Sequence, residues 1–325
     1  MTAIVKPIPS NSTVHHLRPF DARRDLNAVA DLIELGFSDT LDDDGRRYLR
    51  QMRTAAQTFD HSGFFGLGGW ISGFAMVGYV WEENNQVVGN VNLIPYLVGT
   101  KRYFLIANVV VYPNYRGRGI GRALTKKAVE HAQRSGAPAV WLHVRTENEV
   151  ARRLYESLGF IEQARRITWH CQGEASTVDL TDGLKILPRR SQHWQKQRNW
   201  LQTNYPKELL WNLSLRLNLF HPGLVGSVTR FINNTAINQW AILERDSLAA
   251  VTSWQSGPGQ SNTLWLAAPQ EVKDSVLQAL LVYTHNNLPS RRPLILDYPS
   301  GWSERAIEAA GFRPHQTLIW MKKHL

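Results

Sequence analysis

An apolar strand, a loop rich in glycine and arginine, and a helix follow one another directly in the middle of the chain. The strand ends in Val109-Val110-Val111-Tyr112-Pro113, and the loop covers residues 114–121. Apolar side chains at helical spacing then extend over residues 119–134, before a glycine, a proline and a second apolar strand at residues 139–144. This order predicts an α+β fold with a strand–loop–helix–strand unit at its centre.

The loop of this unit is suited to bind a pyrophosphate. Its glycines let the backbone approach a ligand, and the helix start adds unpaired N–H donors and a positive dipole end. Arg116, Arg118 and Arg122 could neutralise further phosphate charge. The Gly-Lys-Ser/Thr of a Walker loop is absent, and the three glycines are spaced G-x-G-x-G, which differs from the dinucleotide fingerprint. The structural alternative is a glycine-rich surface turn beside solvated arginines.

Two motifs in this region resemble those of the GNAT superfamily of N-acetyltransferases. The loop motif [Arg/Gln]-x-x-Gly-x-[Gly/Ala] is matched by Arg116, Gly119 and Gly121, after a hydrophobic strand that ends in proline. The second motif, Asn-x-x-Ala-x-x-Leu-Tyr-x-x-x-Gly-Phe, is matched by Asn148, Ala151, Leu154, Tyr155, Gly159 and Phe160. The motifs cover residues 105–160, and the opening Leu17-Arg18-Pro19 extends the likeness to residues 14–171.

The resemblance implies acetyl-coenzyme A (acetyl-CoA) as cosubstrate. Tyr155 would be the general acid that protonates the leaving thiolate; the alternative is a core aromatic residue. The pantetheine arm would bind along the strand formed by Val109, Val110 and Val111. The pyrophosphate would be held by Arg116, Gly117, Arg118, Gly119, Ile120, Gly121 and Arg122. Asn148, with Ala151 in the same motif, would contact the cofactor between the two central strands. No metal is expected.

The group that removes the proton from the attacking amine is left open. Direct transfer requires a neutral amine and therefore a base or a chain of waters. Glu82 and Glu83 follow one predicted strand, whereas His143 and Glu147 flank another. Asn108, just before the valines, could only orient a water molecule.

The second half of the chain repeats the order of elements of the first half. Residues 306–312 end in Gly311-Phe312 and echo residues 154–160; each segment follows an apolar strand and precedes another strand. Aligning the Gly-Phe pairs puts Ile307 opposite Tyr155. In place of the arginine–glycine loop, residues 268–274 contain no glycine and two acids. We therefore expect two GNAT-like domains, each a mixed, mostly antiparallel sheet flanked by helices, the second degenerate.

The 325 residues amount to about twice the usual length of a domain. We predict a flexible tail at residues 1–13, a catalytic domain at 14–171, a linker at 172–183 and the degenerate domain at 184–325. The single cysteine, Cys171, can form no internal disulfide and no cysteine-based zinc site. Because the first residues also lack a secretory signal, a cytoplasmic location is expected.

The net charge of +10 predicts an anionic ligand, and coenzyme A is itself a polyanion. Since no nucleic-acid-binding motif accompanies this charge, nucleic acid is not the expected partner. Residues 63–81 carry no charge but contain six glycines, which favours a loop and a strand over a transmembrane anchor. A loop that touches membrane or substrate remains an alternative.

The sequence therefore predicts an N-acetyltransferase that moves an acetyl group from acetyl-CoA to a primary amine by direct attack. The acceptor is a small molecule or a protein amine, and its identity is open. The alternative is a non-catalytic acetyl-CoA-binding sensor, which would bind the cofactor without turnover. The intact Tyr155 favours the enzyme.

Overall fold

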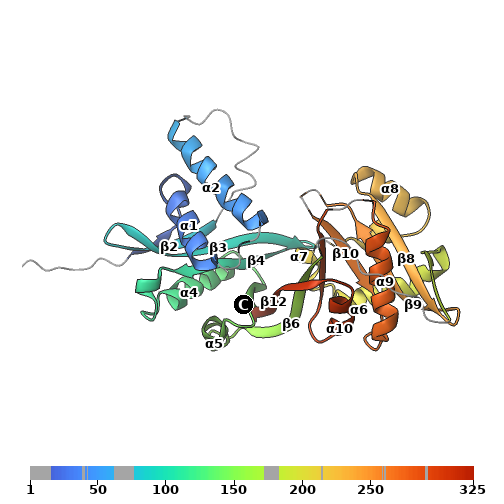
Figure 1. Cartoon of the computed structure of the whole chain (residues 1–325). Helices are drawn as coiled ribbons and strands as arrows, with labels where there is room; N and C mark the ends of the chain where they lie inside the picture. The colour runs from blue at the N-terminus through green and yellow to red at the C-terminus, as the bar shows by residue number, and fades with distance from the viewer. Residues whose placement is uncertain are drawn as a thin grey trace, which may run out of the picture. The chain divides into compact units, whose positions relative to one another are not determined.

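The computed structural model forms two compact units (Figure 1). It describes residues 16–38, 41, 43–61, 77–171, 183–213, 215–257, 259, 261–289 and 292–325. Unit 1 comprises the described residues of Met1–His143, Arg153–Ile161 and Met321–Leu325, and unit 2 those of Val144–Arg152 and Glu162–Trp320. The predicted tail, nearly all of the predicted linker and residues 63–76 of the apolar stretch lie outside the described residues.

Unit 1 is built on a mixed sheet with the strand order β1-β2-β3-β4-β5. The strands are β1 (His16–Pro19), β2 (Val77–Glu83), β3 (Gln86–Val98), β4 (Lys101–Val111) and β5 (Ala139–Arg145). Strands β1 to β4 pair antiparallel, whereas β5 joins β4 in parallel. The chain end belongs to the same unit, because the Leu325 N–H donates to the Pro138 carbonyl at 3.1 Å.

Helices cover both faces of this sheet, as Figure 1 shows. Helices α1 (Ala22–Phe37) and α2 (Asp43–His61) enclose one core, to which β4 contributes Val110. Helix α4 (Ile120–Arg134) packs on the other face against β2, β3 and β4. Its contact with β3 is so close that a Cβ at Gly89 would lie 3.0 Å from side-chain atoms of α4.

A buried ion-pair network joins the start of this unit to β2. Arg18 donates to Asp25 and to Glu82, and Arg24 donates to Glu82, each at 2.6 Å. Asp25 is fully buried and the Glu82 side chain is only 7% exposed. The hydrogen bond from Arg18, with the charge of Arg24, lowers the pKa of the Glu82 carboxyl.

We expect Glu82→Gln to lower the free energy of unfolding at pH 7 by roughly 1–3 kcal/mol, because charge-assisted hydrogen bonds are lost. A lowered pKa stabilises the fold above the ordinary carboxyl pKa, and this contribution disappears as the pH falls through the folded-state pKa. The difference in the free energy of unfolding between wild type and variant, measured by urea unfolding, should therefore be smaller at pH 3 than at pH 7. An unchanged difference would contradict this explanation.

Unit 2 has a mixed sheet with the strand order β12-β6-β11-β10-β9-β8-β7. The strands are β6 (Ile161–Cys171), β7 (Leu184–Pro188), β8 (Ile237–Glu244), β9 (Ser247–Gln255), β10 (Asn262–Ala267), β11 (Leu294–Pro299) and β12 (Arg313–His324). The helices are α6 (Trp194–Asn204), α7 (Leu210–Leu213), α8 (Leu224–Ile232), α9 (Asp274–Asn286) and α10 (Glu304–Ala309). Strand β10 pairs in parallel with β11, whereas the pairs β6–β11, β9–β10, β8–β9 and β7–β8 are antiparallel.

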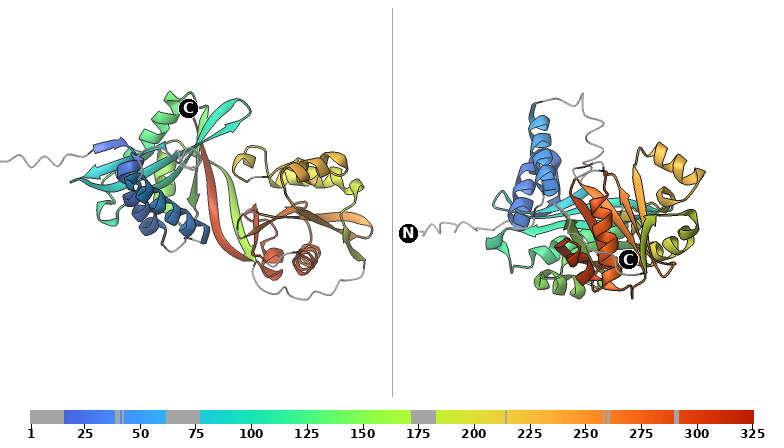
Figure 2. Two further views of the ribbon diagram at one scale, coloured as in Figure 1. Left: turned by 90° about the horizontal axis from the view of Figure 1, so that it is seen from above. Right: turned by 45° about the vertical axis from the view of Figure 1, so that its right-hand side comes forward.

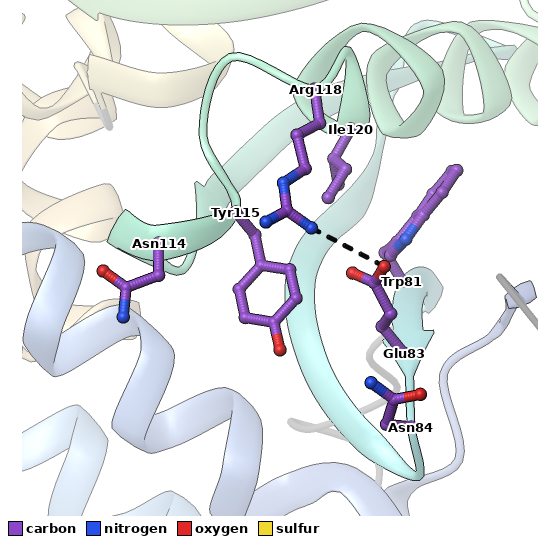
Figure 3. A pocket seen from close by; sticks show the side chains of 7 residues that line it. All are labelled: Trp81, Glu83, Asn84, Asn114, Tyr115, Arg118 and Ile120. Atoms are coloured by element: carbon purple, nitrogen blue, oxygen red, sulfur yellow. Dashed lines mark ion pairs between the residues drawn. The ribbon is translucent and has the colours of Figure 1, made fainter. Parts of the chain in front are cut away.

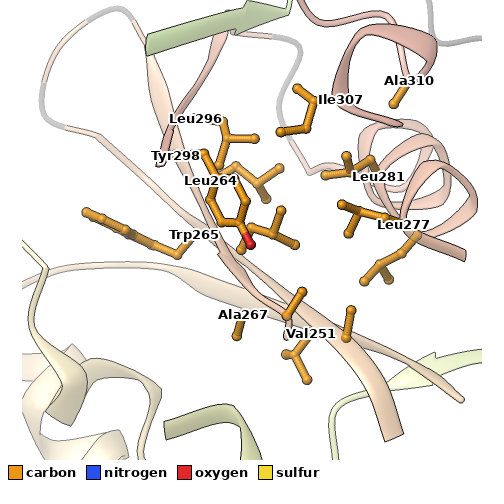
Figure 4. Packing of buried hydrophobic residues seen from close by; sticks show 14 of the residues in the cluster. Val251, Leu264, Trp265, Ala267, Leu277, Leu281, Leu296, Tyr298, Ile307 and Ala310 are labelled. Atoms are coloured by element: carbon orange, nitrogen blue, oxygen red, sulfur yellow. The ribbon is translucent and has the colours of Figure 1, made fainter. Parts of the chain in front are cut away.

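One part of the core of unit 2 lies between its sheet and the helices α9 and α10 (Figure 4), and the same cluster extends to Leu201 of α6 and to Leu219 and Phe220. Leu277 and Leu281 of α9 and Ile307 of α10 point toward Leu264 and Leu296 of the sheet, and all five are fully buried. Nearly every turn of α9 is apolar, which explains why this helix lies deep in the unit.

The two units repeat one order of elements, and the predicted fold class is confirmed. In unit 1 the parallel pair β4–β5 is joined through α4, and in unit 2 the parallel pair β10–β11 is joined through α9. Figure 2 shows the same elements from two further directions. The predicted domain boundaries stay a prediction. No helix among the described residues is long and apolar enough to cross a membrane.

Candidate functional site

Strands β4 and β5 pair with each other over only part of their length. Their register runs from Phe104–Val140 to Ile106–Leu142, although β4 continues to Val111. Beyond this point β4 remains paired with β3 on its other side. Along the described residues after Ile106, one edge of β4 therefore offers backbone N–H and C=O groups to an extended ligand, as in strand-addition recognition.

A β-bulge lies where β4 leaves its parallel neighbour. Asn92 pairs with Ala107 and Asn90 pairs with Val110, so Asn108 and Val109 together face a single residue of β3. Asn108 has a φ of 51°, a conformation that asparagine tolerates better than most residues. Because an extra residue re-aims the strand, the bulge changes the direction of the backbone just before the three valines.

A buried asparagine cluster supports the bulge. Asn90 donates to the Asn92 side-chain oxygen at 2.9 Å and to the Asn108 carbonyl at 3.0 Å, and Asn108 donates to the same Asn92 oxygen at 3.1 Å. Asn90 Oδ1 and Asn92 Nδ2 have no hydrogen-bond partner in the described structure. One acceptor and one donor thus remain for a water molecule or ligand. Asn90 and Asn92 were not among the predicted site residues, although two amides at alternate positions of an apolar strand are a recognisable signal.

Two substitutions of Asn108 distinguish the effect of its hydrogen bond to Asn92 from the effect of its positive φ. Asn108→Gly and Asn108→Ala both lose the hydrogen bond to Asn92, but only alanine is strained at positive φ. We expect the alanine variant to be less stable than the glycine variant by about 1 kcal/mol in urea unfolding. Equal stability of the two variants would show that the left-handed conformation is not maintained in solution.

The glycine–arginine loop leads from β4 into α4 with an open surface. Gly117 and Gly119 have φ values of 77° and 79°, and a Cβ at either would meet no heavy atom within 4 Å. Arg116, Arg118 and Arg122 are exposed; Arg116 Nε is hydrogen-bonded to the Val111 carbonyl at 3.1 Å. Since Ala123 makes the first helical bond to Gly119, the preceding N–H groups form the unpaired N-terminus of α4.

A pocket of about 710 Å³ lies beside this loop (Figure 3). It is lined by Trp81, Glu83, Asn84, Asn114, Tyr115, Arg118 and Ile120. The guanidinium of Arg118 lies 4.9 Å from the centre of the Tyr115 ring and 3.7 Å from the Glu83 carboxylate. The pocket therefore has a cation, an aromatic face and a carboxylate in reach of one ligand.

Tyr155 lies in α5 (Glu149–Ser157), at the point where this helix ends. The Phe160 N–H donates to the Tyr155 carbonyl at 3.1 Å and the Gly159 N–H to the Glu156 carbonyl at 2.9 Å, with a φ of 84° at Gly159. This is a Schellman cap, in which the Tyr155 and Phe160 rings make the usual apolar contact. Burial raises the pKa of Tyr155 to about 12, so its hydroxyl is protonated at neutral pH.

The same cap occurs in unit 2. Phe312 donates to the Ile307 carbonyl and Gly311 to the Glu308 carbonyl, with a φ of 91° at Gly311. The structure thus confirms that Ile307 occupies the position equivalent to Tyr155. Because isoleucine, which has no hydroxyl, occupies this position of the cap, the cap alone does not require tyrosine.

The predicted site residues fall into two groups. The valines, the loop residues and Tyr155 belong to unit 1. There the loop lies close to α5, because a Cβ at Gly121 would be 3.7 Å from the Leu154 side chain. Arg122 also donates to Ser157 at 2.8 Å. Asn148 and Ala151 are assigned to unit 2; the Asn148 side chain accepts the Ala151 N–H at 3.1 Å and caps α5.

The candidate bases differ in availability. Glu82 is engaged by two arginines in the network described above. Burial lowers the pKa of His143 to about 4, so its imidazole is neutral at neutral pH. Glu147 is exposed beside Thr146, and Glu83 faces Arg118 in the pocket. The base therefore remains open, but Glu82 is the least suited to this role.

These features fit acetyl-CoA. An open loop at a helix N-terminus suits a pyrophosphate, and the unpaired edge of β4 suits the amides of a pantetheine arm. No group of three or more metal-ligating side chains occurs among the described residues. In unit 2, residues 268–273 lead into α9 with no glycine, so a second loop of this kind is absent from the described chain.

Comparisons with known proteins agree with this geometry. Residues 41–160 match the model of the Acetyltransferase (GNAT) family. The chain is 40% identical to the [Ribosomal protein bS18]-alanine N-acetyltransferase of Escherichia coli K12 over 63 residues, 19% of this chain and 43% of that protein. It is 30% identical to the mycothiol acetyltransferase of Frankia alni over 188 residues, 52% of this chain and 48% of that protein. The chain thus spans less than half the length of these curated relatives.

A solved structure extends the similarity of fold to nearly the whole chain. The GCN5-related N-acetyltransferase of Sphaerobacter thermophilus aligns with a TM-score of 0.54 at 14% identity, covering 95% of each chain. At this identity the match concerns the fold alone. Together with the strand–loop–helix geometry of unit 1, these findings place residues 41–160 of the chain in the Acetyltransferase (GNAT) family.

Proposed function

We propose that the chain is an acetyl-CoA-dependent N-acetyltransferase whose cofactor binds in unit 1, between β4 and the part of α5 that carries Tyr155. The observation that carries the proposal is the loop at Gly117 and Gly119, where a strand edge without a partner leads into an open helix N-terminus. Anions bind well at such helix starts because unpaired N–H groups and the helix dipole act together.

Binding would use backbone more than side chains. The β4 backbone at Val109 and Val111 would hydrogen-bond the pantetheine amides, and N–H groups of residues 117–122 would hold the pyrophosphate. Arg116 and Arg122 each keep donors beyond the hydrogen bond that each makes within the protein, and these could reach phosphate oxygens. Asn148, as cap of α5, would orient the helix that carries Tyr155.

Acetyl-CoA, when bound, supplies the acetyl group as a thioester. The amine nitrogen would attack the thioester carbonyl carbon, the C–S bond would break, and the amine would lose one proton to a base or water. Tyr155 would donate its hydroxyl proton or a hydrogen bond to the thiolate sulfur and regain the proton from solvent. Its pKa of about 12 exceeds that of an ordinary thiol, but the same burial would also raise the pKa of a thiol beside it.

We further propose a primary amine as acceptor. The relatives are named for acetylation of an alanine of a ribosomal protein and for mycothiol, so a polypeptide N-terminus and a small amine are both reasonable probes. The acidic Glu83 beside Arg118 is one group that could attract a cationic amine to the loop side of the site.

Thiol release tests the proposal. The full chain is incubated with acetyl-CoA and either an alanyl peptide or a panel of small primary amines, and free coenzyme A is measured with a thiol reagent. We expect amine-dependent thiol release with one member of these panels. Cofactor binding without any amine-dependent thiol release would favour the sensor. The absence of both cofactor binding and thiol release would overturn the proposal.

A further inference from the structure

Helix α8 of unit 2 exposes its apolar side chains. Leu224, Val225, Val228, Phe231 and Ile232 are 84%, 55%, 54%, 87% and 74% exposed. They account for five of the nine residues of this helix. Surface helices normally direct such residues to the core, and a contiguous exposed apolar face marks an interaction site.

Among the polar side chains of α8, Arg230 contacts the rest of the unit, whereas the other bonds lie within the helix. Arg230 donates to the Leu219 carbonyl at 2.8 Å and to Ser227 at 3.1 Å, and the Thr229 hydroxyl donates to the Val225 carbonyl at 2.7 Å. A Cβ at Gly226 would lie 1.9 Å from the His221 carbonyl oxygen. Because only glycine permits this approach, the backbone itself holds the helix with its apolar face outward.

The segment that contains α8 is strongly basic. Residues 184–234 hold eight basic side chains and one acidic side chain, Glu208. Lys196 and Arg198 of α6, Lys207 and Arg216 are exposed. This concentration of positive charge favours an anionic partner.

Three arginines lie directly around α8 and the 3₁₀ helix η4 (Leu217–Phe220) that packs against it. Arg189 donates to the Phe220 carbonyl, Arg230 to the Leu219 carbonyl, and Arg216 to the side chain of the α8 cap residue Asn233. None of these three forms an ion pair with a carboxylate among the described residues. Burial and the charge of Arg230 lower the pKa of Arg189 to about 10, as expected for neighbouring cations without an anion.

We propose that α8 is a membrane-docking helix, which lies in the headgroup region of an anionic lipid surface. Its outward apolar residues would enter the acyl boundary, and the arginines around α8 would contact lipid phosphates. A single convex helix needs no matching groove when it lies in such an interface. This surface consists of residues of unit 2, whereas the proposed pyrophosphate loop belongs to unit 1.

Other occupants fit the observations less well. Nucleic acid would satisfy the cations but would leave five large apolar side chains without apolar neighbours. A second copy of the chain could cover the apolar face, but it would bring two basic segments together without compensating acids. An anionic lipid surface supplies both negatively charged headgroups and an apolar acyl-chain region.

Vesicle flotation with the full chain tests the proposal. Vesicles of phosphatidylcholine alone are compared with vesicles containing one quarter phosphatidylglycerol, for wild type and for Leu224→Ser/Phe231→Ser/Ile232→Thr. The matched control is Ile94→Thr/Leu97→Ser/Val98→Thr, which removes three exposed apolar side chains from β3. Circular dichroism and size-exclusion chromatography with light scattering report folding and oligomeric state for each protein.

We expect wild type and control to bind the anionic vesicles. Neutral vesicles or high salt should weaken partitioning about fivefold for each lysine or arginine that no longer interacts with an anionic headgroup. The α8 variant should partition at least about tenfold more weakly while remaining folded. Absence of wild-type binding, or equal binding of the α8 variant, would overturn the proposal. A wild-type dimer that the α8 changes convert to a monomer, without lipid binding, would assign the surface to a second copy.

Discussion

Replacing Tyr155 with phenylalanine should lower kcat roughly 100-fold or more, with little change in the KM for acetyl-CoA. Phenylalanine keeps the ring contact with Phe160 and both hydrogen bonds of the Schellman cap, because those bonds use backbone atoms. Only the hydroxyl that would serve the leaving thiolate is removed. The free energy of unfolding should therefore change by less than about 1 kcal/mol.

Tyr79→Phe provides the matched control. It makes the same chemical change in unit 1, where the Tyr79 hydroxyl lies 3.0 Å from His131 Nδ1, and should leave kcat unchanged. A Tyr155→Phe enzyme with wild-type kcat would show that Tyr155 is only the apolar residue of the cap, as Ile307 is in unit 2. The steady-state rate of thiol release at saturating amine measures this difference.

Gly119→Val should raise the KM for acetyl-CoA at least tenfold, since about 1.5–3 kcal/mol is lost with each charge-assisted hydrogen bond to phosphate. A Cβ at Gly119 would meet no heavy atom within 4 Å, so the added side chain would extend into the space in which a ligand approaches the loop. Positive φ at Gly119 adds strain of roughly 1–2 kcal/mol to the folded state.

Gly136→Val is the control that distinguishes backbone strain at positive φ from a loss of contact with the cofactor. Gly136 has a φ of 71°, also has nothing within 4 Å of a built Cβ, and follows the opposite end of α4. Both variants should lose similar stability in urea unfolding, but only Gly119→Val should lose cofactor affinity. If the two variants had the same KM for acetyl-CoA, the loop would not be the pyrophosphate site.

The strand–loop–helix–strand segment around residues 109–144 could be predicted from the sequence because its signals are local. Helical spacing after Gly119, a glycine and a proline at the helix end, and the Gly-Phe pairs all act within a few residues of where they are found. The Gly159-Phe160 and Gly311-Phe312 pairs marked two helix ends, and the structure gives their shared reason as a Schellman cap.

Features that depend on distant parts of the chain were not predictable in this way. The bulge at Asn108 exists because β4 pairs with β3 out of step, which no local pattern reveals. Strand β6 pairs with β11, about 130 residues further along the chain, and periodicity cannot specify such a partner. The apolar face of α8 points outward because Gly226 touches a neighbouring turn, an arrangement that hydrophobic spacing alone would have reversed.

Isothermal titration of the full chain with acetyl-CoA tests the central claim most directly. We predict saturable binding with one cofactor per chain, because only unit 1 carries the glycine loop among the described residues. Gly119→Val should bind acetyl-CoA much more weakly. Absence of binding, equal affinity of wild type and Gly119→Val, or two equivalent sites per chain would contradict it.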